Sequence, residues 1–309
     1  MPLTQLNFQP GLDTENTPTG AEGRWVDGDK IRFRKGLPQK IGGWTKFSTG
    51  YYIGVGRALE QWFSLDGGRY EAIGTDRKIY TYASGISQDI TPIRSTDALV
   101  NAISTTTSSN IITITDAGHG ASQGDFVTLS NVSATVGGLT ASVLDAEYEI
   151  LTISNTNAYT VQSSGTANAN VAPTANCTAN YQIGIGPSIQ TFGFGWGSGT
   201  WNTGTWGTAR SSSNVVLDAR LWSINNWGED LIITQRDGST YEWDTSLGMS
   251  NNRAEVIANA PTNSTLSMIS TETRHVVCLG TETAIGNTAS VDKMFIRWSD
   301  QENYNQWTP

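Results

Sequence analysis

Residues 72–82 read AIGTDRKIYTY, and residues 232–243 read IITQRDGSTYEW. Each stretch is a short apolar run ending in Thr, then a charged turn, then a run in which aromatic residues alternate with other side chains. Alternation with a period of two is typical of β-strands, and a short polar turn joins two such strands into a hairpin. A third copy consists of VVCLGT at 276–281 and, after a longer loop, KMFIRWSD at 293–300. The sequence therefore predicts a repeated strand–turn–strand unit.

Repeated antiparallel units are typical of β-propellers, where each small sheet buries one face against its neighbour. A polar loop and a further short strand follow each copy, as in DITPI at 89–93 and AEVIANA at 254–260. We predict an all-β fold with a β-propeller-like body, with a β-sandwich as the alternative. NYNQWTP at 303–309 opens another unit, so we expect a propeller that is incomplete in this chain and a natural protein that continues past Pro309.

The residues between the first two copies have a different composition. Residues 97–182 lack Trp, Lys and Arg and are rich in Thr, Ser, Asn and Ala. Strands are predicted at NIITITDAG (110–118), GDFVTLSNV (124–132), AEYEILTIS (146–154) and AYTVQSS (158–164). We predict a separate small β-barrel or sandwich inserted into a propeller loop, where insertions are tolerated. The expected organisation is an extended N-terminal arm (1–23), a first propeller part (24–96), the inserted domain (97–182) and a second propeller part (183–309).

The overall composition agrees with this all-β prediction. Charged residues make up only 15% of the 309 residues, whereas the chain has 33 Gly, 11 Trp and 10 Tyr. The net charge of −9 argues against a sequence-reading nucleic-acid binder, which needs a basic face for phosphates. No signal-peptide pattern and no apolar run near 18 residues is present, so we expect no membrane span.

One segment of the chain is basic. Residues 24–46 hold seven Lys and Arg against two Asp. The candidate docking residues in this segment are Arg24, Lys30, Arg32, Arg34 and Lys35. They could meet an acidic partner or a phosphate; alternatively, they belong to a solvated edge strand that Lys and Arg protect from pairing.

No catalytic, metal or cofactor-binding constellation is present in the sequence. His119 and His275 have no Cys or His at ligand spacing, and Cys177 and Cys278 are expected to be small buried hydrophobes. Asp27 and Asp29 could serve a glycosidase in principle, but acids at that spacing are usually turn residues. The sequence has no phosphate loop or dinucleotide fingerprint. We predict that the protein is not an enzyme.

A tryptophan run occurs at 193–210, GFGWGSGTWNTGTWGTAR, with Trp196, Trp201 and Trp206 at every fifth position. A carbohydrate platform needs converging polar groups, and a base-stacking ladder needs interleaved cations. Asn202 and Arg210 alone are too few for either. We therefore favour structural anchors, with an oligomer interface as the alternative.

Several stretches resemble the tail hub or nozzle proteins of short-tailed bacteriophages. They are GFGWGSGTWNTGTWGTA at 193–209, ARLWSINNWGEDLIITQRDGSTYEWD at 219–244 and MFIRWSDQENYNQWTP at 294–309. The segment GLDTENTPTGAEGRWVDGDKIRFRKGLPQKIGGW at 11–44 resembles the opening of those proteins. TDAGHGASQGDFVTLSNV at 115–132 and LDAEYEILTISNTNAYTV at 144–161 resemble a small β-barrel module common in phage tails. Residues 144–148 depart from that module, which usually has Asn-Gly before the strand.

The resemblance implies a structural virion protein of the tail, synthesised in the host bacterial cytoplasm. It implies a homohexamer below the portal and the head–tail adaptor, with a central channel that retains and releases the genome. DNA would pass an acidic lumen without sequence-specific binding. The N-terminal arm and nearby loops would contact the adaptor, and tail fibres or a tail needle are further candidate partners. The alternatives are a receptor- or glycan-binding fibre or lectin-like propeller module and, third, a polysaccharide-degrading tail enzyme.

Overall fold

The computed structural model describes residues 8–43, 45, 50–65, 67–184, 186, 219–250 and 252–307. The chain divides into two compact units, residues 1–49 and residues 50–309. In the described residues, no helix has the length and apolar character needed to cross a membrane.

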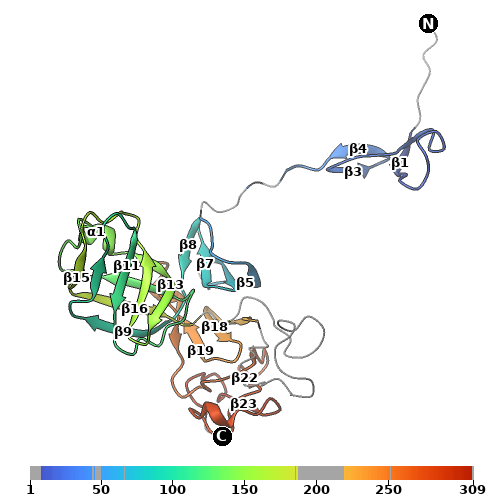
Figure 1. Ribbon diagram of the computed structural model, residues 1–309. Helices are drawn as coiled ribbons and strands as arrows, with labels where there is room; N and C mark the ends of the chain where they lie inside the picture. Colours follow the sequence, from blue (N-terminus) through green and yellow to red (C-terminus); the bar gives the residue numbers. More distant parts are fainter. Residues whose placement is uncertain are drawn as a thin grey trace, which may run out of the picture. The chain divides into compact units, whose positions relative to one another are not determined.

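The N-terminal unit consists of two small pairs of strands (Figure 1). β1 (Gln9–Leu12) runs parallel to β2 (Arg24–Trp25), whereas β3 (Ile31–Arg34) and β4 (Leu37–Lys40) form an antiparallel hairpin. The turn residues Lys35 and Gly36 have φ values of 50° and 80°. Positive φ at both central positions is the geometry that a two-residue hairpin favours, and Gly adopts it without strain.

In the second unit, the three predicted copies each form an antiparallel hairpin within a sheet. The first sheet is β5 (Gly56–Phe63), β6 (Arg69–Thr75), β7 (Ile79–Ala83) and β8 (Ile86–Asp89), in that order. The second is β17 (Trp222–Trp227), β18 (Asp230–Gln235), β19 (Thr240–Trp243) and β20 (Glu255–Val256). The third is β21 (Leu266–Ile269), β22 (Val276–Leu279) and β23 (Ile296–Trp298). Short 3-10 helices span Thr245–Leu247 and Thr288–Ser290.

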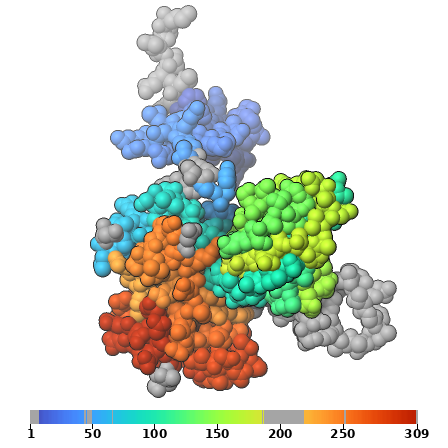
Figure 2. All heavy atoms as spheres, turned by 90° about the vertical axis from the view of Figure 1, so that its left-hand side faces the viewer, coloured from blue at the N-terminus to red at the C-terminus, as the bar shows by residue number. Residues whose placement is uncertain are grey.

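The second sheet is buried on both faces. One face packs on the first sheet, where the rings of Trp62 and Trp243 meet edge to face with centroids 6.2 Å apart. The other face packs on the third sheet through Ile232, Val276 and Cys278. In the space-filling view, the last part of the chain (red) lies against the orange part (Figure 2), and after the third sheet the ring of Tyr304 contacts that of Trp227 in β17 with centroids 5.5 Å apart. The all-β prediction is therefore confirmed, with successive sheets each burying a face on the next.

The segment between the first and second sheets forms an eight-stranded antiparallel sheet, called the insert below. In chain order its elements are β9 (Ile93–Leu99), β10 (Ile103–Thr105), β11 (Ile111–Thr115), β12 (Phe126–Ser130), α1 (Ala141–Leu144), β13 (Glu147–Asn155), β14 (Ala158–Gln162), β15 (Val171–Thr174) and β16 (Cys177–Gln182). The strand order is β15-β10-β11-β14-β13-β12-β16-β9. β13 pairs with β14 along its second half and with β12 along its first, so the sheet curves around a core of its own. β9 and β15 stay unpaired with each other in the described residues, so the sheet is not a closed barrel.

Candidate functional site

The five candidate docking residues all lie exposed in the N-terminal unit. Arg32 and Arg34 alternate with Ile31 and Phe33 along β3, so both arginines project from the same face of the hairpin. Lys30 and Lys35 flank that strand, both with positive φ. Arg24 lies on β2, 3.6 Å from the Asp13 carboxylate.

The cationic side chains of the hairpin lie close together in the chain and are exposed to solvent. Arg32 donates from Nε to the Gln39 side chain opposite it (3.1 Å), and Lys30 Nζ lies 3.7 Å from its neighbour Asp29. Exposed contacts of this kind hold side chains weakly. The guanidinium groups of Arg32 and Arg34 are therefore free to reorient toward an acidic surface or a phosphate.

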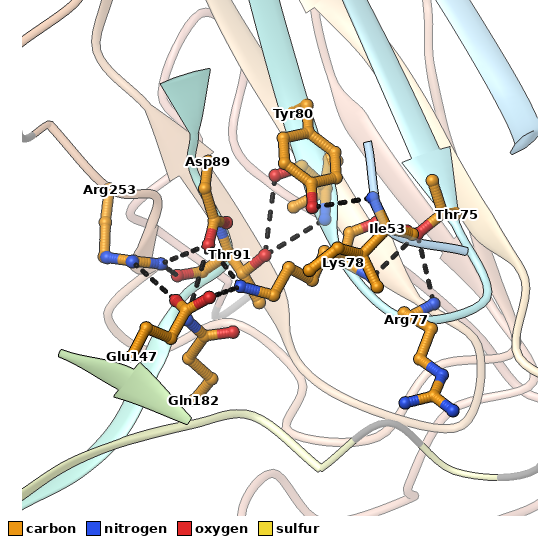
Figure 3. Close-up of polar contacts among 11 residues, drawn as sticks. Ile53, Thr75, Arg77, Lys78, Tyr80, Asp89, Thr91, Glu147, Gln182 and Arg253 are labelled. Atoms are coloured by element: carbon orange, nitrogen blue, oxygen red, sulfur yellow. Dashed lines mark hydrogen bonds and ion pairs between the residues drawn. The ribbon is translucent and has the colours of Figure 1, made fainter. Parts of the chain in front are cut away.

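A buried lysine forms a second candidate site, the Lys78 junction, which consists of Lys78, Asp89, Glu147, Gln182 and Arg253 (Figure 3). The Lys78 side chain is only 1% exposed, and its Nζ donates to Asp89 Oδ2 at 2.8 Å and to Glu147 Oε1. The ammonium also lies 4.3 Å from the centre of the Phe126 ring. A buried ammonium requires such partners because desolvation would otherwise favour its neutral form.

The junction joins three parts of the second unit. Lys78 lies in the turn just before β7 of the first sheet and Asp89 ends β8, whereas Glu147 begins β13 of the insert. Gln182, the last residue of β16, donates to Glu147 Oε2 at 2.6 Å. Arg253, which precedes β20, lies 3.4 Å from Asp89 and 3.7 Å from Glu147. The polar groups therefore tie the insert to both neighbouring sheets.

The electrostatics of the junction favour the ionised form of Asp89. Burial alone raises the pKa of Asp89, but the positive charges of Lys78 and Arg253 outweigh it and hold the pKa below its ordinary value. Burial raises the pKa of Tyr80 to about 12, despite the hydrogen bond from the Ile53 amide to its hydroxyl. Tyr80 therefore stays protonated at neutral pH.

A cavity of about 620 Å³ adjoins the junction. Its walls come from β8, from β9, β12 and β16 of the insert, and from Met249, Ser250 and Arg253. Most of the lining side chains carry hydroxyls or amides, such as Ser87, Thr128 and Asn180; Asp89 and Arg253 also line it. The volume lies in the range of small-molecule sites, and this lining suits a polar ligand.

The histidines and cysteines occupy structural positions. His119 is buried between β11 and β12: its Nδ1 accepts from the Ala121 amide (3.1 Å) and its Nε2 donates to the Asn155 carbonyl (3.2 Å). His275 contacts the Ser299 carbonyl through Nδ1 at 2.7 Å. Cys177 and Cys278 are both free and buried, as predicted.

The remaining candidates do not form a reactive site in the part of the chain that is described. Asp27 and Asp29 are exposed in the segment before β3. Among the described residues, no group of three or more His, Cys, Asp or Glu side chains is placed to hold a metal ion. Trp196, Trp201 and Trp206 lie outside the described residues, so their role as anchors stays a prediction.

Sequence reasoning missed the Lys78 junction. The stretch AIGTDRKIYTY predicts a charged turn that includes Lys78, a position that is usually solvated. No local pattern distinguishes a turn lysine that another part of the chain will cover. Glu147, the first residue of β13, likewise has no sequence pattern that marks it as a partner of a buried lysine.

Comparisons with known proteins give remote structural likeness alone. No protein-family model matches the sequence, and no curated protein matches it. Among solved structures, the chain is similar to the phage phi92 endosialidase at 14% identity and a TM-score of 0.25, over 88% of this chain and 39% of that chain. The chain thus spans about two fifths of that structure's length. A likeness at this level carries no argument about the site.

Proposed function

We propose that this protein is a structural, non-enzymatic component of a short-tailed phage tail, in which it acts as a hub or nozzle. Six copies would surround a channel below the head–tail adaptor and allow genome retention and ejection. The observation that carries the proposal is that the stretch resembling nozzle proteins, residues 219–244, forms β17, β18 and β19 of the second sheet, which packs between two others.

Two further features support a mechanical role. The Lys78 junction uses buried ionic contacts to hold the insert against the sheets, and each charged group in it lies beside an opposite charge, which restricts relative motion. The body of the protein is acidic outside residues 24–46. An acidic channel wall repels phosphates and lets DNA move without being retained.

The basic hairpin is proposed as the surface that docks to the adaptor. Arg32→Glu, Arg34→Glu and Lys35→Glu together reverse its charge, and assembly of tails onto DNA-filled heads should be lost. Two single variants distinguish an effect of this face of the hairpin from an effect of the net charge, which both change equally. Arg34→Glu should impair attachment more than Lys40→Glu. Both lie on the same hairpin, but Lys40 pairs with Ile31 on the opposite face. Unchanged attachment of the triple variant contradicts the docking role.

Electron microscopy of purified tails tests the function as a whole. Six copies around an open channel between adaptor and distal tip are the expected result. Copies confined to peripheral fibres would contradict the nozzle proposal.

The cavity beside the junction favours a second candidate, binding of a host glycan by a fibre-like module. In that case the isolated protein should bind host polysaccharide saturably. Asn180→Ala, which removes an amide from the cavity wall, should weaken that binding. Absence of saturable binding excludes this candidate.

A further inference from the structure

On the outward face of the third sheet, every residue that is paired with a neighbouring strand is apolar. Leu266, Leu279 and Ile296 lie side by side across β21, β22 and β23, and Met268, Val277 and Trp298 form the adjacent row. Leu266, Met268, Ile296 and Trp298 are between 40% and 54% exposed. We call these six residues the rear face. A contiguous apolar face of this kind on a soluble protein marks an interaction surface.

The packing inside the chain indicates what covers such a face. The second sheet contacts the first through Ile233 and Trp243 and contacts the third through Ile232 on its other side. We call the side of a sheet that packs on the preceding sheet its front, and the side that packs on the following sheet its rear. Both contacts therefore join the rear of one sheet to the front of the following sheet. The rear face of the third sheet continues this succession, and no described residue of a fourth sheet covers it.

The first sheet presents the complementary surface at the other end. Ile73 pairs with Tyr80 in the hairpin β6–β7, as Ile233 pairs with Tyr241 in β18–β19. The side of the first sheet that carries Ile73 therefore corresponds to the side of the second sheet that packs on its predecessor. On this side Leu59 pairs with Ile73, Gln61 and Glu71 form the next row, and Phe63 pairs with Arg69, whose guanidinium lies 5.6 Å from the centre of the Phe63 ring.

This front face, defined as Leu59, Phe63 and Ile73, remains open at one end. Tyr52 and the Ile53 amide contact Tyr80 and cover the other end. Leu59 and Phe63 are 60% and 64% exposed. An aromatic and a leucine of this exposure provide the anchors that protein interfaces use.

We propose that the rear face of the third sheet binds the front face of the first sheet in a second copy of this chain. The contact repeats, between molecules, the arrangement that joins the sheets within one molecule. It is heterologous because two different surfaces meet, and repeated contacts of this type close into a ring or extend into a filament. The inference rests on sheet packing and goes beyond the proposed tail function; a ring of copies is also what a hexameric nozzle requires.

Analytical ultracentrifugation of the 309-residue chain tests the contact. The wild type should self-associate in a concentration-dependent way. Trp298→Lys and Phe63→Lys should each weaken that association about tenfold or more, because each places a charge in the contact. Val100→Lys, which changes an exposed valine of the insert, is the matched control and should associate like the wild type.

Mixing the two variants distinguishes this contact from other modes. Trp298→Lys keeps its front face and Phe63→Lys keeps its rear face, so an equimolar mixture should form a complex that neither variant forms alone. Circular dichroism checks that each variant is folded, and Met268→Lys replaces Trp298→Lys if the latter is not. A monomeric wild type at all concentrations overturns the proposal, as does a Phe63→Lys variant that associates normally. Nozzle copies located in tails would leave the tail function standing even if this solution test failed.

Discussion

Replacing Lys78 by methionine keeps most of the apolar stem of the side chain and removes its ammonium group. The change leaves the Asp89 and Glu147 carboxylates without the cation that lies between them. Because Lys78 is buried at the contact between the first sheet and the insert, water cannot replace the ammonium without opening that contact. We therefore expect the free energy of unfolding of the second unit to fall.

The expected loss follows from the exposure of the two carboxylates. Removing one partner of a fully buried ion pair costs about 3 to 5 kcal/mol. Here the Asp89 and Glu147 side chains are 18% and 31% exposed, and Arg253 still lies 3.4 Å and 3.7 Å from them. Partial solvation and the remaining cation reduce the expected loss to about 2 to 3 kcal/mol at neutral pH.

The loss should depend on pH with a defined sign. The pKa of Asp89 is held below its ordinary value of 3.8 in the folded protein. Its ionised form therefore contributes stability above that pH, and the contribution disappears as the pH falls through the folded pKa. Without Lys78 this contribution is largely absent, so the difference between wild type and Lys78→Met should shrink below about pH 4.

Denaturant unfolding followed by tryptophan fluorescence measures the difference. The matched control is Arg77→Met on the same turn, which breaks the exposed pair of Arg77 with Glu149 (2.6 Å) and should cost less than about 1 kcal/mol. Adding Asp89→Asn and Glu147→Gln to Lys78→Met should recover part of the loss, because the unpaired charges are then absent. A loss below about 1 kcal/mol, or one that is unchanged between neutral and acidic pH, would refute this account of the junction.

Two other predictions concern packing and thiol reactivity. A Cβ at Gly74 would lie 2.6 Å from Cδ1 of Trp222, so Gly74→Ala should lower the free energy of unfolding by about 1 to 3 kcal/mol. Gly56→Ala, whose Cβ meets its nearest neighbour at 3.8 Å, is the control, and equal thermal unfolding of both variants contradicts the predicted clash. Burial raises the pKa of Cys177 and of Cys278 to about 11, so a disulfide reagent should modify neither thiol in the native protein at pH 8 and both after unfolding. Rapid native-state modification would contradict their burial.

Local pattern was sufficient for the hairpins and for the longer strands of the insert. The stretches at 72–82 and 232–243 form β6–β7 and β18–β19, because strand alternation and turn residues act between neighbours in sequence. β11, β12 and β14 lie within the predicted segments for the same reason, and β13 extends one residue beyond its segment, to Asn155.

Other strands had no such signal. β16 reads CTANYQ, a run poor in β-branched residues, and it is a strand because β12 and β9 pair with it on both sides. β9 comes 78 or more residues earlier in the chain than its partner residues, as in the pairing of Leu99 with Cys177. Pairing over that separation is a property of the folded chain, and local composition carries little information about it.

The sequence by itself determined the all-β class, the repeated hairpin unit, the burial of both cysteines and the exposure of the basic hairpin. Each depends on interactions between close neighbours or on side-chain hydrophobicity alone. Only the tertiary structure decided that Lys78 is buried and that, among the described residues, four side chains of the rear face of the third sheet are exposed. Glu147 lies 69 positions from Lys78, and the rear face is apolar by its register across three strands. Long-range packing selects which charged turn residue is covered and which apolar face remains exposed.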